Sequence, residues 1–563
     1  MNTPDRLIGT VRTLPFPADK KLAYQAVRSD IRPVRSHART FFLLLATGLV
    51  AVPTHAQRNG PPAGLDDYVA RALRQFGTPG VAIAIVKDGR VVLTKGYGLR
   101  RLGDAAPVDA HTLFQIASNT KAFTTAALAM LVDSAKLRWD DHVTDFIPDF
   151  QLSDPWVTRE FTVRDMLTHR SGLGLGAGDL LWLHSDYPEH EIVRRIRAAK
   201  TASSFRSQYA YDNVMYIAAG ELIPAITSQS WAEFVRRRIF EPLGMTTASA
   251  TLLGVPPNAD MATSHDLVDG HMRVIPADSA DVTASAGAIV ACVADLSKWL
   301  IVQLDSGRLG DRRLWTAERT RDMWSPQTIR PIDEDNTPVA ALAPSFSAYG
   351  LGWGLTDYRG RKMVAHSGGL AGMTSRTVLI PSQRLGVVVL TNADNSLSDA
   401  LALWIVDAYL GGQRVDWVNA FAAKARKADS AAAQVEQKAK SARATDSKPS
   451  LPLDKYAGGY SDTLYGDATI AEEDGRLVLR FSHSPAFVGD LEHWQYDTFV
   501  AHWRMPTLPD AYVTFSLTPD GAIDTMKIAA VSPLADFSFD FQDLLFRPAR
   551  APTAPTAPSA SPN

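Results

Sequence analysis

The first regular pattern in the chain is a helical one. Apolar residues recur at spacings of three and four over residues 65–76, and a glycine follows, which predicts a helix that ends there. Two uninterrupted apolar runs come next, at residues 81–86 and 91–93. They are separated by a short polar stretch with Asp88 and Gly89 at its centre. An Asp-Gly pair between β-rich runs is typical of a hairpin turn, so we predict an antiparallel strand pair here.

Helical patterns dominate the middle of the chain. Residues 111–325 are mostly helical in pattern and are broken by Gly- and Pro-containing loops. Strand-like runs return at residues 364–366, 376–380 and 386–390. An order of strands, helices and strands predicts an α+β domain in which the N- and C-terminal strands share one sheet and the helices pack on it.

The composition changes after this domain. Large apolar residues become scarce over residues 421–450, where Ala, Lys, Ser and Gln dominate, so we predict a partly helical, exposed linker. Short strand-like runs then alternate with turns over residues 451–548 and predict a separate all-β domain, either a sandwich or a small barrel. The Ala-Pro-Thr-rich residues 549–563 predict a disordered tail.

The N-terminus resembles an export signal. Residues 40–52 form an uncharged apolar run of thirteen, which is shorter than the roughly 20 residues of a membrane-spanning helix. Arg35 and Arg39 precede the run, and Thr-His-Ala at 54–56 follows it. This order predicts a signal peptide cleaved before Gln57 and a periplasmic or secreted protein.

Two alternatives for this segment stay open, a short buried helix and a membrane anchor. About 34 residues of polar, Pro-containing sequence stand ahead of this segment, more than such signals usually carry, which suggests that translation starts further downstream, near Val27 or Val34.

Charge and cysteine content exclude several functions. The 563 residues carry a formal net charge of −2, and the first 56 are basic, so the remainder is mildly acidic. That balance argues against nucleic acid as the main partner. The single cysteine, Cys292, excludes an intrachain disulfide and a cysteine-built metal site. The chain has no His-Glu-x-x-His and no phosphate-binding or dinucleotide-binding glycine motif, so we expect no metal and no cofactor.

One Ser-x-x-Lys motif stands out, Ser118 to Lys121, at the predicted start of a helix. Residues three apart on a helix lie on one face, so the two side chains can meet. Serine needs a base to remove its proton, and a lysine with the ordinary pKa of ~10.4 is neutral in only about 0.04% of molecules at pH 7. Lys121 must therefore be desolvated to act as that base. Taken alone, the motif more often marks a solvated helix start.

Two further segments carry candidate chemistry. Tyr211 can act as a proton shuttle if nearby cations lower its pKa, and Asn213 can bind a substrate amide or orient a lysine. His366 is followed by Ser-Gly-Gly, and glycines at a strand edge let a substrate backbone approach free N–H groups. Each segment alone is more often a core tyrosine with a loop asparagine, or a surface histidine.

In this order and at these separations, the three segments together resemble the serine β-lactamase and penicillin-binding-protein superfamily. The most similar branch is that of the class C β-lactamase-like serine hydrolases, which includes esterases and D-aminopeptidases. The resemblance covers residues 65–410, and four further stretches support it: 161–173, 239–245, 349–354 and 390–392. Residues 451–548, with Tyr-Ala-Gly-Gly-Tyr at 456–460, resemble the lipocalin-like β-barrel often appended to this branch.

The resemblance implies a fold and a set of roles. It implies an antiparallel sheet flanked by helices with an all-helical region, over a hydrolase domain of residues 57–420. Ser118 would be the acylated nucleophile, with Lys121 and Tyr211 as its base system. Asn213 would contact the substrate, and the N–H groups of Ser118 and Gly369 would form the oxyanion hole.

The sequence departs from the family's lactamases at one motif. Those enzymes have Lys-Thr-Gly where this chain has His366, Ser367 and Gly368. A lysine is a permanent cation suited to a β-lactam carboxylate, whereas a histidine of pKa ~6.5 is mostly neutral at pH ~7.5. We therefore predict ester or amide substrates, D-amino-acid-containing peptides among them, rather than efficient β-lactam hydrolysis. We also expect activity to fall below about pH 6.5 if neutral His366 is needed.

Two other functions remain as alternatives. One is a penicillin-binding or sensor protein of the same fold with little turnover, or a weak β-lactamase. The other is an α/β-hydrolase in which Ser367 is the nucleophile of an Ala-x-Ser-x-Gly elbow, with its histidine downstream (His483, His493 or His502). Such an elbow needs a helix directly after the serine, and the sequence that follows is Gly-rich and then strand-like. In either case we expect a small-molecule or peptide substrate and leave homo-oligomerisation open.

Overall fold

The computed structural model describes residues 60–333, 337–411 and 413–549. The predicted signal segment and almost all of the predicted tail lie outside these residues. Within the described ranges, no helix combines the length and the apolar character that crossing a bilayer requires.

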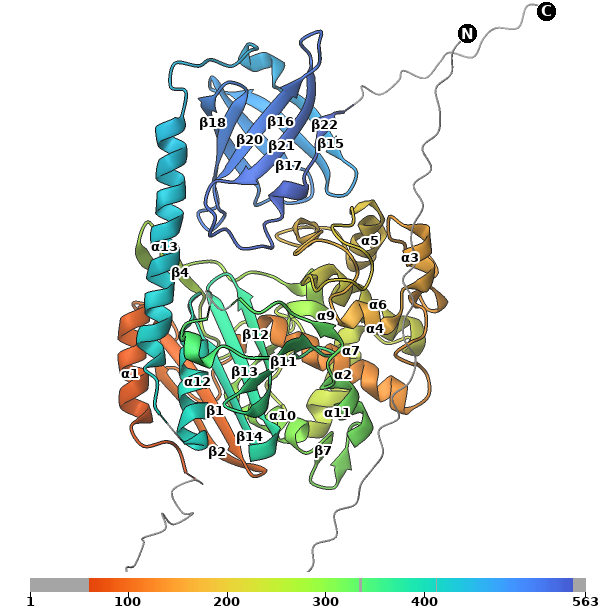
Figure 1. Ribbon diagram of the computed structural model, residues 1–563, viewed down its shortest axis with the longest axis vertical. Coiled ribbons are helices and arrows are strands. Elements are labelled where there is room, and N and C mark those ends of the chain that lie inside the picture. The colour runs from red at the N-terminus through yellow and green to blue at the C-terminus, as the bar shows by residue number, and fades with distance from the viewer. Residues whose placement is uncertain (1–59, 334–336, 412, 550–563) are drawn as a thin grey trace, which may run out of the picture. The chain divides into compact units, whose positions relative to one another are not determined.

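One large sheet organises the first part of the chain (Figure 1). All its neighbouring strands are antiparallel. In spatial order they are β2 (Arg90–Gly98), β1 (Gly80–Lys87), β14 (Leu385–Thr391), β13 (Met373–Ile380), β12 (Arg361–Leu370), β11 (Gly354–Tyr358), β10 (Ser347–Tyr349) and β9 (Thr328–Ile329). The predicted hairpin is β1–β2, and β1 pairs with β14, so the expected meeting of N- and C-terminal strands is confirmed.

Strand β1, second from one edge of the sheet, is buried on both faces. Its side chains alternate, so that Ile83 and Ile85 enter one hydrophobic core while Ala82 and Ala84 enter another. The first core lies under α1 (Leu65–Phe76) and α12 (Leu397–Leu410), and the second lies under α10 (Val293–Leu304) and the helical region. Helices therefore cover both faces of the sheet, which confirms the predicted α+β class.

The helical region is the part of the chain between β2 and β9. Figure 1 shows most of its helices grouped to one side of the strands. They are α2 (Thr120–Asp133), α3 (Pro155–Glu160), α4 (Val163–Leu167), α5 (Glu189–Arg195), α6 (Asn213–Thr227), α7 (Trp231–Val235), α8 (Glu241–Leu243), α9 (Ala284–Gly287), α10 and α11 (Ala317–Met323). Three short strand pairs connect them, β3 (Phe114–Gln115) with β6 (Val290–Ala291), β4 (His265–Val268) with β5 (His271–Val274), and β7 (Arg308–Leu309) with β8 (Arg312–Arg313).

A long helix, α13 (Trp417–Ala442), joins the α+β domain to the C-terminal domain. Its first turns are buried through Trp417, Val418 and Phe421, and the rest of the helix is mostly exposed. The domain boundary that we propose near residue 421 therefore falls inside one continuous helix.

The C-terminal domain is an eight-stranded antiparallel barrel rather than a sandwich. Its strands follow the order β21 (Ile523–Ala530), β20 (Ala511–Leu517), β19 (Thr498–Trp503), β18 (Val488–Gln495), β17 (Arg476–Phe481), β16 (Gly466–Glu473), β15 (Gly458–Asp462) and β22 (Arg547–Pro548). A bridge between Met526 and Phe546 nearly closes the ring. The predicted all-β character of this region is confirmed.

Candidate active site

Ser118 lies between a strand and a helix. It sits in a short 3₁₀ turn (Ala117–Asn119) that leads from β3 into α2, and its side chain is partly exposed at the bottom of a cleft. The residue before it, Ala117, has a φ of 47°, a left-handed conformation that costs energy for a residue with a Cβ atom. Strain of this kind is often stored at functional sites, and here it fixes where Ser118 enters the cleft.

Lys121 follows one turn later and is completely buried. Its Nζ lies 3.0 Å from Ser118 Oγ, 2.7 Å from Asn213 Oδ1 and 3.0 Å from the carbonyl oxygen of Ala286. The last two atoms can only accept hydrogen bonds. A neutral amine therefore donates both its hydrogens to them and directs its lone pair at the hydroxyl of Ser118. That is the arrangement a general base requires.

The electrostatics of the site favour the neutral amine. Burial lowers the pKa of Lys121 to about 7, because the charged ammonium loses its hydration, and the negative charges of Asp179 and Asp212 only partly offset the loss. At pH 7 about half of the lysine is then deprotonated, compared with about 0.04% of an ordinary lysine.

Tyr211 lies just before α6, against the same pair. Its ring centroid is 4.9 Å from Lys121 Nζ, and its hydroxyl hydrogen-bonds with Ser118. Burial raises the pKa of Tyr211 well above 10. The sequence argument required cationic neighbours to lower this pKa, and burial has the opposite effect. Tyr211 is therefore a neutral phenol that can pass a proton on rather than a standing phenolate.

Asn213 begins α6, and both ends of its amide are occupied. Its Oδ1 accepts from Lys121, while its Nδ2 donates to Asp179 Oδ2 at 2.8 Å. Of the two roles considered from sequence, binding a substrate amide or orienting the lysine, these contacts match the second.

His366 lies on β12 and is buried. Its Nδ1 is 2.6 Å from the carbonyl oxygen of Ser367, so Nδ1 carries the hydrogen, and Nε2 accepts from the hydroxyl of Tyr349 at 2.8 Å. Burial lowers the pKa of His366 to about 3. The pKa near 6.5 expected from sequence is therefore wrong, and His366 stays neutral across the physiological range.

The strand edge beyond His366 faces the turn that carries Ser118. A Cβ on Gly368 would lie 2.3 Å from the carbonyl oxygen of Ile116 and 2.9 Å from the backbone nitrogen of Ser118, so only glycine permits this approach. Gly369 has open space around its Cα. Strand β11 pairs with β12 only as far as Ala365, so it leaves this edge uncovered.

The cleft has a volume of about 780 Å³. Besides the residues above, its lining includes Leu175, Trp182 and His184 from the loop after α4, and Arg330 after β9. The described residues contain no group of three or more His, Cys, Asp or Glu side chains placed to hold a metal ion.

Ser367 does not occupy a nucleophile elbow. It lies inside β12, opposite Arg376, and the chain continues into β13 without an intervening helix. The α/β-hydrolase alternative is therefore wrong.

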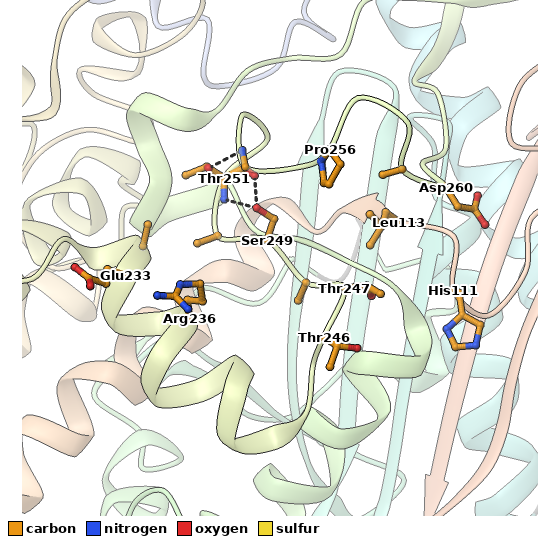
Figure 2. Close-up of a pocket in the computed structure, with 15 residues that line it drawn as sticks. His111, Leu113, Glu233, Arg236, Thr246, Thr247, Ser249, Thr251, Pro256 and Asp260 are labelled. Carbon is orange, nitrogen blue, oxygen red and sulfur yellow. Dashed lines mark hydrogen bonds between the residues drawn. The ribbon is translucent and has the colours of Figure 1, made fainter.

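A second cavity of about 780 Å³ lies between α7 and the loop that follows α8 (Figure 2). Its serine, Ser249, donates to the carbonyl oxygen of Thr251 at 2.7 Å, and no lysine lines the cavity. It therefore has no nucleophile and base like those of the cleft.

Sequence reasoning missed three contributors to the cleft. Asp179 is fully buried next to Asn213, in a loop that carried no motif, and Tyr349 belonged to a stretch noted only for its family likeness. Ser538 comes from the C-terminal domain, 359 residues after Asp179 in the chain. No local pattern in the sequence relates Asp179 or Ser538 to the other residues of the site.

A serine at a helix start, hydrogen-bonded to a buried lysine beside an antiparallel sheet flanked by helices, is the arrangement of a serine hydrolase. Comparison with protein families gives the same class. The beta-lactamase family model matches residues 65–411, so the chain belongs to this family and is a beta-lactamase-family serine hydrolase. Residues 442–548 match a second family, a domain of unknown function called DUF3471.

Individual relatives agree with this assignment. The unguisins hydrolase ungD' of Aspergillus campestris is 30% identical over 458 residues, which cover 75% of this chain and 80% of that protein. Protein flp of Staphylococcus aureus is 25% identical over 337 residues, covering 59% and 63% of the two chains.

Solved structures show the same fold. The octameric penicillin-binding protein homologue from Pyrococcus abyssi has a TM-score of 0.54 and 22% identity, over 83% of this chain and 97% of that one. The D-amino acid amidase from Ochrobactrum anthropi has a TM-score of 0.51 and 23% identity, over 62% and 98%.

Proposed function

We propose that this protein hydrolyses ester or amide bonds through an acyl-enzyme formed on Ser118. The observation that carries the proposal is the 3.0 Å contact between Ser118 Oγ and the buried Nζ of Lys121, whose hydrogens are committed to Asn213 and Ala286. The amine lone pair is then free to take the serine proton.

The reaction has two halves. Ser118 Oγ attacks the substrate carbonyl carbon while its proton moves to Lys121 Nζ, and the backbone N–H groups of Ser118 and Gly369 stabilise the oxyanion. The leaving alcohol or amine departs with a proton supplied by Tyr211, which Lys121 reprotonates. Water then attacks the acyl-serine and gives a proton to Lys121, which passes it to Ser118 Oγ as the acid leaves.

We assign His366 a role in positioning Tyr349 rather than in proton transfer. Both its ring nitrogens are occupied, by Tyr349 and by a carbonyl oxygen, and its low pKa keeps it neutral. A neutral side chain at this position gives no ionic recognition of a β-lactam carboxylate, which supports esters and amides as substrates.

Peptides that contain D-amino acids are the amide substrates we propose to test first. A relative named as a hydrolase of unguisins and a solved D-amino acid amidase of the same fold support this choice. Export, with cleavage before Gln57, and assembly into a homo-oligomer are further proposals. N-terminal sequencing of the mature protein and light scattering test them.

The deciding experiment treats the purified protein with a fluorophosphonate and, separately, with a fluorescent penicillin, and then maps the label by peptide mass. We expect phosphonate on Ser118, no lasting penicillin adduct, and turnover of esters or D-aminoacyl amides. Ser118→Ala is the control and should take no label. A stable penicillin adduct on Ser118 without turnover would replace the proposal with a penicillin-binding role, and a label elsewhere would refute it.

A further inference from the structure

The C-terminal barrel lines the catalytic cleft chiefly through the segment between β21 and β22, together with Thr507 from between β19 and β20. Residues 536–540 lie between β21 and β22, and Phe537, Ser538 and Phe539 line the cleft together with Ser118. The Phe537 ring lies edge-on to Tyr211, with centroids 5.7 Å apart.

Ser538 makes the most specific of these contacts. It is buried, and its Oγ donates to Asp179 Oδ2 at 2.8 Å. The same oxygen accepts from Asn213 Nδ2 at 2.8 Å, and Asn213 Oδ1 accepts from Lys121. An unbroken chain of hydrogen bonds therefore runs from the barrel to the catalytic base.

Asp540 holds the other side of the same loop. Its two carboxylate oxygens accept from the backbone N–H groups of Gly178 and Leu180, at 2.8 and 3.2 Å, so they bracket Asp179. The hydroxyl of Tyr465, from the barrel, also donates to Asp540. Residues of the C-terminal domain thus hold both the side chain of Asp179 and the backbone on either side of it.

We propose that Asp179 and Ser538 are positioning residues for the Lys121 base, so that the C-terminal barrel is a working part of the active site. This rests on the proposed function of Lys121. The barrel acts through the carboxylate charge of Asp179, which Ser538 stabilises and which in turn stabilises the protonated form of Lys121.

The direction in which the pKa of Lys121 shifts follows from the groups around Lys121 and Asp179. Burial raises the pKa of Asp179 to about 7, and the Ser538 hydrogen bond acts against this rise. Without that bond Asp179 is more often neutral, and the pKa of Lys121 falls. The other titratable groups facing the pair, present in every variant, are Asp212, Asp540, Tyr211, Tyr216, His169 and His366.

The test compares Ser538→Ala and Asp179→Asn with Ser461→Ala, an exposed serine on β15 of the same barrel. The readout is the rate of fluorophosphonate labelling of Ser118 against pH. We expect the acid limb to move to lower pH by about 0.5 unit in Ser538→Ala and about 1 unit in Asp179→Asn, with no shift in Ser461→Ala. An acid limb in Ser538→Ala that coincides with that of Ser461→Ala would overturn the inference.

A second readout does not depend on reactivity at Ser118. Since the Ser538 hydroxyl binds a carboxylate more strongly than a carboxylic acid, the loss of unfolding free energy in Ser538→Ala should grow as pH rises from 6 to 9. Ser461→Ala should show a constant difference. If wild-type Ser118 takes no label, the proposed function fails, and this stability measurement still decides whether Ser538 controls the charge of Asp179.

Discussion

Burial of Lys121 makes the stability of the fold depend on pH in a way that one substitution isolates. The pKa of Lys121 drops from the ordinary 10.5 to about 7, so the unfolded chain binds the proton more tightly than the folded chain. The free energy of unfolding therefore falls as the pH is lowered from 10.5 to 7 and levels off below that. Linkage with these two values gives a loss of about 3 kcal/mol between pH 9.5 and pH 7.

Lys121→Met retains an unbranched side chain and removes the titrating group. The variant also loses the hydrogen bonds to Asn213 and Ala286, which costs about 1–3 kcal/mol for each orphaned acceptor at every pH. That cost displaces the stability curve without changing its slope. The slope of the difference between the two proteins is therefore the diagnostic quantity.

The assay is urea unfolding of both proteins in half-unit steps from pH 6 to pH 9.5. Groups that do not interact with Lys121 cancel in the difference. We expect the wild type to gain about 3 kcal/mol on the variant as the pH rises from 7 to 9.5. Parallel curves would show that the lysine keeps an ordinary pKa when folded, and Lys121 could then not act as the base at neutral pH.

Three further predictions concern the same cleft. Tyr211→Phe should lower kcat by about 10²-fold and leave the acid limb of the pH–rate profile in place, because the phenol passes a proton but does not set the charge of the base; full activity would exclude Tyr211 as a proton donor. His366→Gln should keep the acid limb of the wild type, since a histidine of pKa about 3 does not titrate there; a shifted limb would show that it does. Gly368→Ala should lower the melting temperature and slow labelling of Ser118, because the new Cβ would collide with the carbonyl oxygen of Ile116. Gly369→Ala should keep the wild-type melting temperature, because there is open space where its Cβ would lie. Equal melting temperatures for the two glycine variants would contradict the close approach.

Much of the fold could be predicted from local patterns. The β1–β2 hairpin follows from an Asp-Gly pair between apolar runs, and the helix from Leu65 to Phe76 follows from apolar spacing. The choice between sandwich and barrel for the C-terminal domain could not be predicted. It depends on where the last strand pairs: β22 lies beside β15, far back in the chain, and the bridge between Met526 and Phe546 joins the same end of the chain to β21.

The candidate site also combines features that could be predicted from the sequence with features that could not. The pairing of Ser118 with Lys121 could be predicted from sequence, because their spacing is a property of one helix start. The charges of the site residues could not be predicted, because they depend on tertiary packing. The pKa values of Lys121, Tyr211 and His366 are shifted by burial, which depends on which distant segments pack around them.

The contribution of the barrel to the active site depends on tertiary packing alone. Asp179 and Ser538 are 359 residues apart, and neither lies in a motif, so no local pattern relates them. They meet because the segment between β21 and β22 packs into the cleft, where a buried carboxylate must find donors from whatever backbone and side chains surround it. Sequence encodes the reacting groups, and packing sets their protonation, because desolvation is a property of the assembled fold.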